Sequence, residues 1–422
     1  MQQCTQLPLR APRLLALAFV VAGLVSLPAT AQFAGRESTG WTSSWGASPS
    51  DPADALNGQT IREHVRLSLG GTKIRIRLSN RFGTGDLVLG AVHVALHGTG
   101  SGTLPGTDRT VTFSDQPSFT IPVGAQVVSD EISLTVKALD EISVSIFLPG
   151  ATGPLPIHQL GVSTTYISPP GDFTAAGVMP VSTTSLSRYL LSEVEVLRPG
   201  AVAVVTLGDS ITDGYASTVD ANRRWPDFLA ERLRSQQSAT PGMKPVAVVD
   251  EGISGNRLLH DIAGPNAQER FDRDVIAQSH VKWVTVLEGI NDLGFPGSVE
   301  PNAPRVTFKQ IVGAYKQLIA RAHAARLKIY GCTLTPFEGT TFAGYFAPDK
   351  EQVREDVNSW IRNSGQFDAV IDFDKAVRDP SHPTRILPAY DVGDHLHPND
   401  AGYRAMADAV DLRLFRDDGN DD

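Results

Sequence analysis

The stretch AVAVVTLGDSITDG, residues 201–214, decides the fold of the C-terminal half of the chain. Residues 201–206 are a continuous apolar run, which is typical of a strand buried on both faces of a parallel sheet. Asp209 and Ser210 follow at the carboxyl end of that strand, where open α/β sheets build their sites. Ser210 is therefore a candidate nucleophile, and the alternative is that it caps a helix. This stretch alone does not decide between the two.

Apolar strands and amphipathic helices alternate along the chain after residue 201. The alternation predicts a parallel sheet with helices on both faces, a three-layer α/β/α domain at residues 198–416. The expected strands are 201–207, 245–250, 282–288, 328–334 and 368–373. The expected helices are 222–236, 266–279, 307–326, 350–363 and 400–414.

The preceding region has a different pattern, in which apolar and polar residues alternate with a period of two. In residues 73–78, Ile74, Ile76 and Leu78 fall on one face of a strand and two arginines on the other. Glycine-rich turns such as 98–102 separate such runs. The pattern predicts an all-β, jelly-roll-like sandwich domain at residues 40–190.

The first residues resemble a targeting segment. Arg10 and Arg13 precede the apolar run 14–27, and Ala29-Thr30-Ala31 follows. We expect residues 1–31 to be a signal peptide cleaved after Ala31, with an uncleaved anchor as the alternative. The run is shorter than the roughly 20 residues of a membrane span. The expected protein is secreted or periplasmic, without stable membrane insertion.

The net charge limits the classes of binding partner, and the cysteine content limits the thiol chemistry. Cleavage would remove two arginines and no acidic residue, so the net charge would move from −9 to −11. Such a chain is a poor partner for nucleic acid or an anionic membrane, and a neutral substrate is expected. Cys332 would be the one remaining cysteine, in an apolar run that predicts a buried, unreactive thiol.

Two further segments follow the second and third expected strands, and so reach the same edge of the sheet as Ser210. Gly255 lies in the segment 250–257, and its N–H could face a substrate because no side chain blocks it. Asn291 lies in the segment 288–292, and its amide is a suitable donor to a developing negative charge. The alternatives are a turn glycine and an asparagine in an Asx-turn.

A histidine with a nearby carboxylate precedes the last expected helix. Asp394 and His397 are three residues apart, so one turn can hold both, with one ring nitrogen on the carboxylate and the other facing the serine. His395 has no carboxylate at the corresponding position. Asp379 and His382 repeat the spacing, but the proline-rich segment 379–388 around them is expected to be a loop.

Four segments in this order resemble the SGNH or GDSL hydrolase family over residues 201–414. Arg224-Trp225-Pro226 and the segment 397–403 are also similar to that family, whereas Ile211 stands where the name has leucine. The resemblance implies a flavodoxin-like sheet and an ester hydrolase that needs no metal or other cofactor. The implied roles are nucleophile for Ser210, general base and acid for His397, orientation of that histidine for Asp394, and an oxyanion hole from the N–H groups of Ser210 and Gly255 and the side chain of Asn291.

The expected substrate is an acetylated glycan, because the sequence resembles the carbohydrate-acting branch of the family. A lipase or arylesterase with longer acyl groups is one alternative, and an inactive glycan-binding protein is another. The segment 337–346 is either a wall or lid of the site or an ordinary packed loop. The β domain binds glycan, covers the site, or only packs beside it, and Trp41 and Trp45 either stack on sugars or belong to its core.

Overall fold

The computed structural model describes residues 40–240 and 242–416, which belong to one compact unit. The expected signal peptide, residues 1–31, lies outside the described residues. Within the described ranges, no helix has both the length and the apolar character that crossing a bilayer requires.

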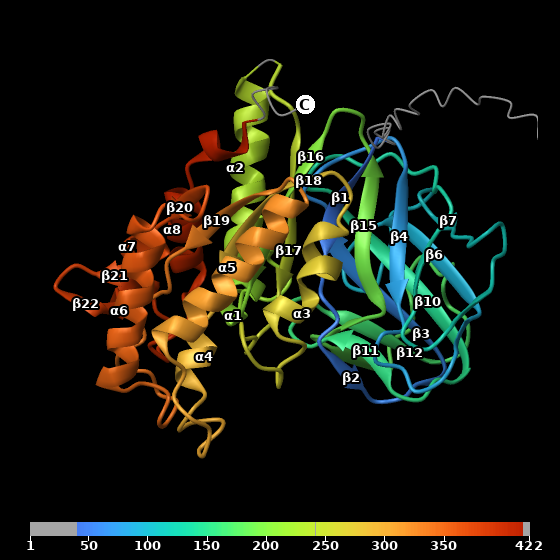
Figure 1. The fold of residues 1–422 in the computed structure, drawn as a ribbon. Helices are drawn as coiled ribbons and strands as arrows, with labels where there is room; N and C mark the ends of the chain where they lie inside the picture. Colours follow the sequence, from blue (N-terminus) through green and yellow to red (C-terminus); the bar gives the residue numbers. More distant parts are fainter. Residues whose placement is uncertain (1–39, 241, 417–422) are drawn as a thin grey trace, which may run out of the picture. The chain divides into compact units, whose positions relative to one another are not determined.

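The C-terminal half is built on a parallel sheet of five strands, and the α/β prediction is confirmed (Figure 1). The strand with the opening stretch lies inside the sheet between the second and third strands, which is a flavodoxin-like order. From edge to edge the strands are β17 (Val246–Gly252), β16 (Val202–Gly208), β18 (Val281–Leu287), β19 (Lys328–Cys332) and β20 (Ala369–Ile371).

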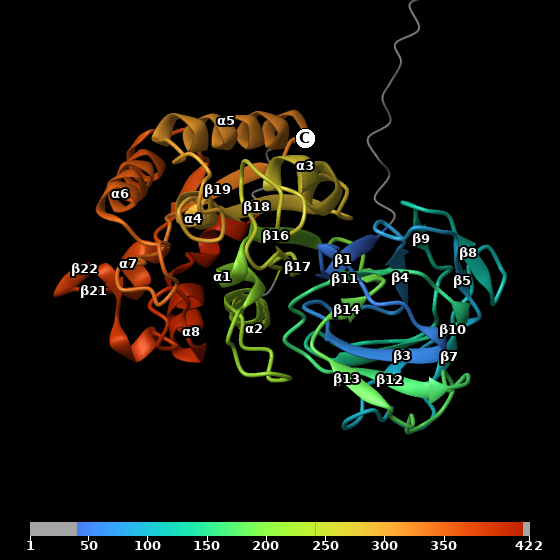
Figure 2. The same cartoon turned by 90° about the horizontal axis from the view of Figure 1, so that it is seen from below.

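Helices cover both faces of this sheet (Figure 2). One layer contains α3 (Ala267–Phe271), α5 (Phe308–Ala324) and α6 (Pro348–Asn363). The other contains α2 (Trp225–Ala239), α8 (Asp400–Ala409) and α7 (Phe373–Val377). The three layers place the carboxyl ends of the strands at one common edge, so short segments after different strands can meet there.

Several boundaries differ from the expectation for local reasons. The helix expected at 266–279 is α3 followed by a π-helical turn, η1 (Asp272–Ile276), and the last helix ends at Ala409 before a 3₁₀ turn, η3 (Leu412–Phe415). The short helices α1 (Ser210–Asp213) and α4 (Ile290–Gly294) are too brief to show a helical period.

The prediction of a loop at residues 379–388 was wrong. It contains a hairpin of β21 (Arg378–Asp379) and β22 (His382–Ile386), followed by η2 (Pro388–Tyr390). A two-stranded hairpin consists of edge strands, where Pro383 is tolerated because its missing N–H can face away from the partner.

The N-terminal region is all β, as predicted, and its strand pairs are antiparallel. Ile74, Ile76 and Leu78 are buried, as their alternation indicated. One sheet has β1 (Trp41–Gly46), β15 (Leu191–Leu197), β4 (Ile74–Ser79) and β9 (Gln126–Val128). A second has β13 (Thr183–Ser185), β12 (Thr165–Pro170), β3 (Asn57–Arg66), β10 (Glu141–Ala151), β6 (Ala91–Leu96) and β7 (Arg109–Thr110). Smaller sheets are β14 (Arg188–Tyr189), β11 (Leu155–His158) and β2 (Asp51–Ala53), and β5 (Leu87–Leu89) with β8 (Phe119–Ile121).

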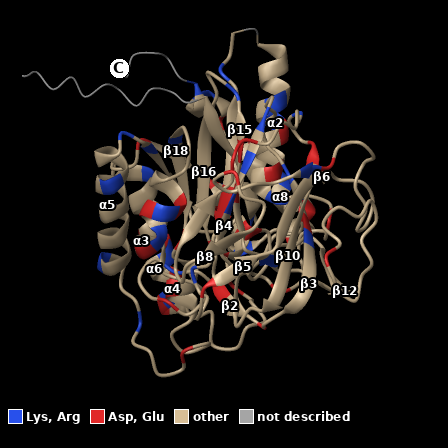
Figure 3. Cartoon of the chain, turned by 90° about the vertical axis from the view of Figure 1, so that its right-hand side faces the viewer, with Lys and Arg blue, Asp and Glu red and all other residues tan. Residues whose placement is uncertain are grey.

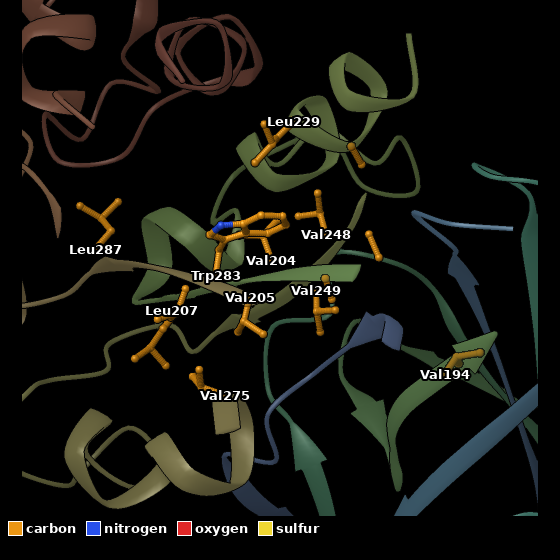
Figure 4. Close-up of a cluster of buried hydrophobic side chains, with 14 of the residues drawn as sticks. Val194, Val204, Val205, Leu207, Leu229, Val248, Val249, Val275, Trp283 and Leu287 are labelled. Carbon is orange, nitrogen blue, oxygen red and sulfur yellow. The ribbon is translucent and has the colours of Figure 1, made fainter. Parts of the chain in front are cut away.

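The two regions share one hydrophobic core. The same buried cluster includes Val194 of β15 and Val249 of β17 (Figure 4). Trp41 is 5% exposed and lies under the Arg75 guanidinium, which is 4.7 Å from its ring centroid, so it belongs to the core and cannot stack on a sugar. Charged residues of both signs are distributed over the chain (Figure 3). The two-domain division at 40–190 and 198–416 and the jelly-roll topology stay predictions.

Candidate active site

Ser210, His397 and Asp394 form a hydrogen-bonded chain at the carboxyl edge of the sheet. Ser210 is the first residue of α1, and only Asp209 separates it from the end of β16. Its Oγ lies 2.9 Å from His397 Nε2, and His397 Nδ1 lies 2.6 Å from Asp394 Oδ2. Ser210 and His397 are both buried. The structure thus brings together a hydroxyl, an imidazole and a carboxylate in the order that nucleophilic catalysis by serine requires.

The loop before α8 determines which ring nitrogen of His397 carries the proton. Asp394 Oδ1 accepts the backbone N–H groups of Leu396 and His397, each at 2.9 Å. Burial raises the pKa of Asp394, but the hydrogen bonds and charge of His397 outweigh it, so this pKa lies below its ordinary value. An ionised Asp394 can only accept, so the proton of the neutral His397 ring resides on Nδ1. Its Nε2 is then free to take the proton of Ser210.

The other two candidate histidines lie elsewhere. His395 has no carboxylate three residues before it, but its Nδ1 lies 2.5 Å from Oδ2 of Asp391, which is four residues before it. His382 Nδ1 lies 3.5 Å from Asp379 Oδ2. Both side chains are more than half exposed. Of the three Asp–His pairs, the one with His397 faces Ser210.

Two backbone N–H groups near Ser210 are available to a substrate. Asp209 caps α1, because its Oδ1 accepts the Ile211 N–H at 2.9 Å. Neither Ser210 N nor Gly255 N donates to an acceptor within the described residues. Gly255 has φ +79°, and a Cβ there would lie 2.9 Å from the Cβ of Ala263, so a glycine is required.

The side chain of Asn291, in α4, is held by two hydrogen bonds. Its Nδ2 donates to the carbonyl of Asn256 at 2.9 Å, and its Oδ1 accepts the Tyr345 hydroxyl at 2.7 Å. The second N–H of the amide is left for a substrate oxygen. Tyr345 is buried, so its part of the segment 337–346 is support for Asn291 rather than a lid. The sequence contained no signal for this contact, since it joins residues 54 positions apart.

Arg270 of α3 connects the strand ends that carry these groups. It is fully buried and donates to the carbonyl oxygens of Gly208 at 3.0 Å and Glu251 at 2.6 Å. Its Nη2 also lies 3.2 Å from Glu288 Oε1, directly after β18. Burial raises the pKa of Glu288 well above its ordinary value, with the charge of Asp209 acting in the same direction. One guanidinium therefore fixes the ends of β16, β17 and β18 relative to one another.

Two aromatic rings flank His397. The Tyr215 ring centroid lies 4.2 Å and that of Phe342 lies 6.2 Å from the imidazole centroid. Their exposed fractions are 38% and 42%, so both can contact a ligand. The Tyr403 hydroxyl donates to the carbonyl of Tyr215 at 2.7 Å and so attaches this loop to α8. In the segment 337–346, Phe342 therefore lies beside the imidazole, and a wall or lid formed by this segment stays a prediction.

One cluster has metal-binding residue types. His64, His97 and Glu141 each offer a ligand atom, all within 4.8 Å of one another. The two rings are stacked, however, with centroids 4.3 Å apart and an interplanar angle of 13°. Lone pairs lie in the ring plane, so nearly parallel rings do not direct both toward one ion. Their other contacts include Ser143, Ser163, Asp220 and Asn222.

The fold and the site define a hydrolase of carboxylic esters. Residues 206–405 match the model of the GDSL-like Lipase/Acylhydrolase family, and this domain belongs to that family. The resemblance inferred from the four sequence segments is thereby confirmed. No curated protein matches the chain significantly.

Several solved structures are similar over about half of this chain. An acetylxylan esterase from Geobacillus stearothermophilus is 21% identical, with a TM-score of 0.38, over 50% of this chain and 93% of its own. A carbohydrate acetylesterase from Sinorhizobium meliloti is 14% identical, with a TM-score of 0.37, over 49% and 95%. A GDSL-like lipase from Bacteroides thetaiotaomicron is 18% identical, with a TM-score of 0.36, over 49% and 84%.

Proposed function

We propose that the protein is a secreted serine esterase that removes short acyl groups, above all acetyl, from acetylated carbohydrate. The observation that carries the proposal is the chain from Ser210 Oγ through His397 to Asp394, with distances of 2.9 and 2.6 Å. A serine hydroxyl is a weak nucleophile until a base removes its proton, and this geometry supplies the base and the carboxylate that orients it.

The reaction follows from these contacts. His397 Nε2 takes the Ser210 proton as Oγ attacks the ester carbonyl carbon. The negative charge then grows on the carbonyl oxygen, which the N–H groups of Ser210 and Gly255 and the Asn291 amide face. Collapse breaks the bond to the alcohol, and His397 returns the proton to that oxygen. Water, deprotonated by His397, then releases the acid from Ser210 by the same steps in reverse.

The packing beside Asn291 favours a small acyl group. Apolar side chains there pack against one another instead of lining an open groove; the ring centroid of Tyr345 lies 6.3 Å from that of Phe295 and 6.1 Å from that of Phe337. The buried members of this cluster are Ile290, Phe295, Phe337, Tyr345 and Leu396. An acetyl group needs little apolar space, whereas a long acyl chain needs a groove of its own.

The exposed rings favour a carbohydrate alcohol. Tyr215 and Phe342 present partly exposed aromatic faces next to His397, the residue that returns the proton to the leaving alcohol. Apolar faces of sugars can pack against such rings, while the net charge of −9 disfavours anionic polymers. Secretion is proposed from the N-terminal pattern of residues 1–31.

The test compares acyl groups and alcohols on the same enzyme. Release of acetate from a panel of acetylated glycans is measured beside hydrolysis of p-nitrophenyl esters of two to twelve carbons, with Ser210→Ala as the control. We expect the highest kcat/KM at two carbons, acetate release from at least one glycan, and no activity above background in Ser210→Ala. A preference for eight carbons or more would instead establish a lipase, and equal rates in the variant would refute the serine mechanism.

A further inference from the structure

A single buried carboxylate, that of Asp213, joins the nucleophile helix to the segment that contains Gly255. Asp213 is the last residue of α1, three residues after Ser210. Its Oδ2 accepts the backbone N–H of Ser254 at 2.8 Å and the hydroxyl of Ser254 at 2.6 Å. Ser254 directly precedes Gly255, so the direction of the Gly255 N–H depends on where this carboxylate lies.

The other oxygen of this carboxylate contacts a histidine from the N-terminal β region. His158, the last residue of β11, has its Nε2 2.9 Å from Asp213 Oδ1. Both side chains are almost fully buried, at 7% and 3% exposed. The position of Ser254, the residue before Gly255, is thus linked through Asp213 to a residue outside the GDSL-like domain at 206–405.

The surroundings of His158 require its charged form. Nδ1 lies 3.0 Å from the carbonyl oxygen of Ser48, and Nε2 also lies 3.1 Å from the carbonyl oxygen of Leu160. Carbonyl and carboxylate oxygens can only accept hydrogen bonds. Each ring nitrogen must therefore carry a hydrogen, and the ring is an imidazolium that neutralises the buried charge of Asp213.

Other charged groups act on the same ring. Burial lowers the pKa of His158, but the charge and hydrogen bond of Asp213 outweigh it, so this pKa lies above its ordinary value. Arg224, which donates to the Asp213 carbonyl at 2.9 Å, acts in the opposite direction. Burial raises the pKa of nearby Glu63 to about 8, so Glu63 is largely neutral at pH 7. The titratable and charged groups around His158 include Asp213 of α1, Arg224 before α2, Glu63 of β3, Arg188 of β14 and Asp250 of β17, with Arg66 and Asp227 lining the same cavity.

We propose that His158 is a positioning residue for the esterase reaction: its imidazolium holds the Asp213 carboxylate, which in turn holds Ser254, so that the next N–H along the chain, that of Gly255, faces the carbonyl oxygen of the ester. This inference rests on the function proposed above. A buried carboxylate without its cation turns toward water or another donor, and the N–H moves with it. Because the oxyanion forms only in the transition state, the loss falls on kcat and not on KM.

The pH dependence has a definite sign. A raised pKa in the folded protein means that the contact with Asp213 is fully present below the ordinary histidine pKa of about 6.5. The contact is lost as the pH rises through the raised pKa. Activity should therefore gain an alkaline limb that belongs to His158.

The experiment uses matched histidine variants of the full chain. His158→Gln and His382→Gln make the same change, one at a buried contact and one at a side chain that is 66% exposed. kcat and KM for p-nitrophenyl acetate are measured for both, with wild type and Ser210→Ala alongside. Histidine 15N NMR of the wild type, with the His158 signal assigned by its absence in the variant, reports whether both ring nitrogens carry hydrogen.

We expect His158→Gln to lower kcat by about 10- to 100-fold, less than the 10²–10³ typical of losing an oxyanion donor outright, with KM within about twofold. His382→Gln should match the wild type, and the His158 signal should still be that of an imidazolium at the ordinary histidine pKa of about 6.5. A folded His158→Gln with wild-type kcat, or a neutral His158 at pH 6.5, would overturn the inference.

The two proposals fail in different ways. If Ser210→Ala hydrolyses the ester as fast as the wild type, the serine mechanism is wrong. If Ser210→Ala is inactive and His158→Gln is unaffected, only the role of His158 is wrong. Should His158→Gln not fold, the His158 ring signal is assigned in the wild type through correlations to its own backbone, and an imidazolium that titrates without any change in kcat also refutes the inference.

Discussion

Each region of the chain contains a fully buried arginine, and the two arginines stabilise different parts of the structure. Arg62 in β3 donates to the Ser145 hydroxyl at 2.7 Å and to the carbonyl oxygens of Ser101 and Thr174 at 2.6 and 3.0 Å, so it fixes loops of the β region. Arg270 in α3 instead fixes the strand ends beneath Ser210. The comparison teaches that Arg62 holds loops of the β region itself, whereas Arg270 holds the strand ends that carry the reacting groups.

The largest expected effect separates His397 from the other histidines of the catalytic half. Ser210→Ala or His397→Ala should each lower kcat by about 10⁴- to 10⁶-fold, because nucleophile and base act as a unit. His395→Ala and His382→Ala should stay within about threefold, since their rings lie on Asp391 and Asp379. The measurement is steady-state hydrolysis of p-nitrophenyl acetate. A large loss of kcat in His395→Ala would mean that His395, with Asp391, supplies the base instead of His397, which would contradict the geometry.

The next effect concerns the donors to the oxyanion. Asn291→Ala should lower kcat by about 10²- to 10³-fold with little change in KM. Tyr345→Phe removes only the hydroxyl that orients the Asn291 amide, and a smaller loss of roughly 3- to 10-fold is expected. Both are measured as kcat and KM on the same ester. An equal loss of kcat in the two variants would mean that the Asn291 amide donates to the oxyanion only when the Tyr345 hydroxyl holds it, and would contradict the expected order.

The fold of the catalytic half could be predicted because its pattern is local. Each strand is a short apolar run, and each long helix has its own period, as in α5. The helices α1 and α4 were not predicted, because four or five residues are too few to show that period. In the hairpin at β21 and β22, proline suggested a loop, whereas pairing at an open edge tolerates it.

The candidate site was predictable for a related reason, and only in part. Ser210, Gly255, Asn291 and His397 each follow a strand or precede a helix, so topology alone brings them to one edge. The groups that support them are not marked in this way. These supporting residues, which are Tyr345, Arg270 and His158, contact partners far away in the sequence. His158 and Asp213, for example, are 55 positions apart, and a contact of that kind leaves no local sequence pattern.

A smaller effect tests the two arginines directly. Lysine keeps the charge but cannot bond several carbonyl groups in one plane. Arg270→Lys and Arg62→Lys should each lower the free energy of unfolding by about 1–3 kcal/mol, measured by urea denaturation. Only Arg270→Lys should also lower kcat of the folded enzyme, by roughly tenfold, because the ends of β16 and β17 separate. Equal kcat in the two variants would remove the distinction between the regions.

The smallest expected effect decides which region contacts the sugar. Phe342 is 42% exposed beside His397, and Val178 of the β region is 75% exposed. Phe342→Ala should raise KM for an acetylated oligosaccharide by about three- to fivefold, because a lost aromatic contact is worth about 1 kcal/mol. KM for p-nitrophenyl acetate should change less, since that ester has no sugar to stack. Val178→Ala is the matched control, and an increase in the oligosaccharide KM there but not in Phe342→Ala would move glycan recognition from the catalytic half to the β region.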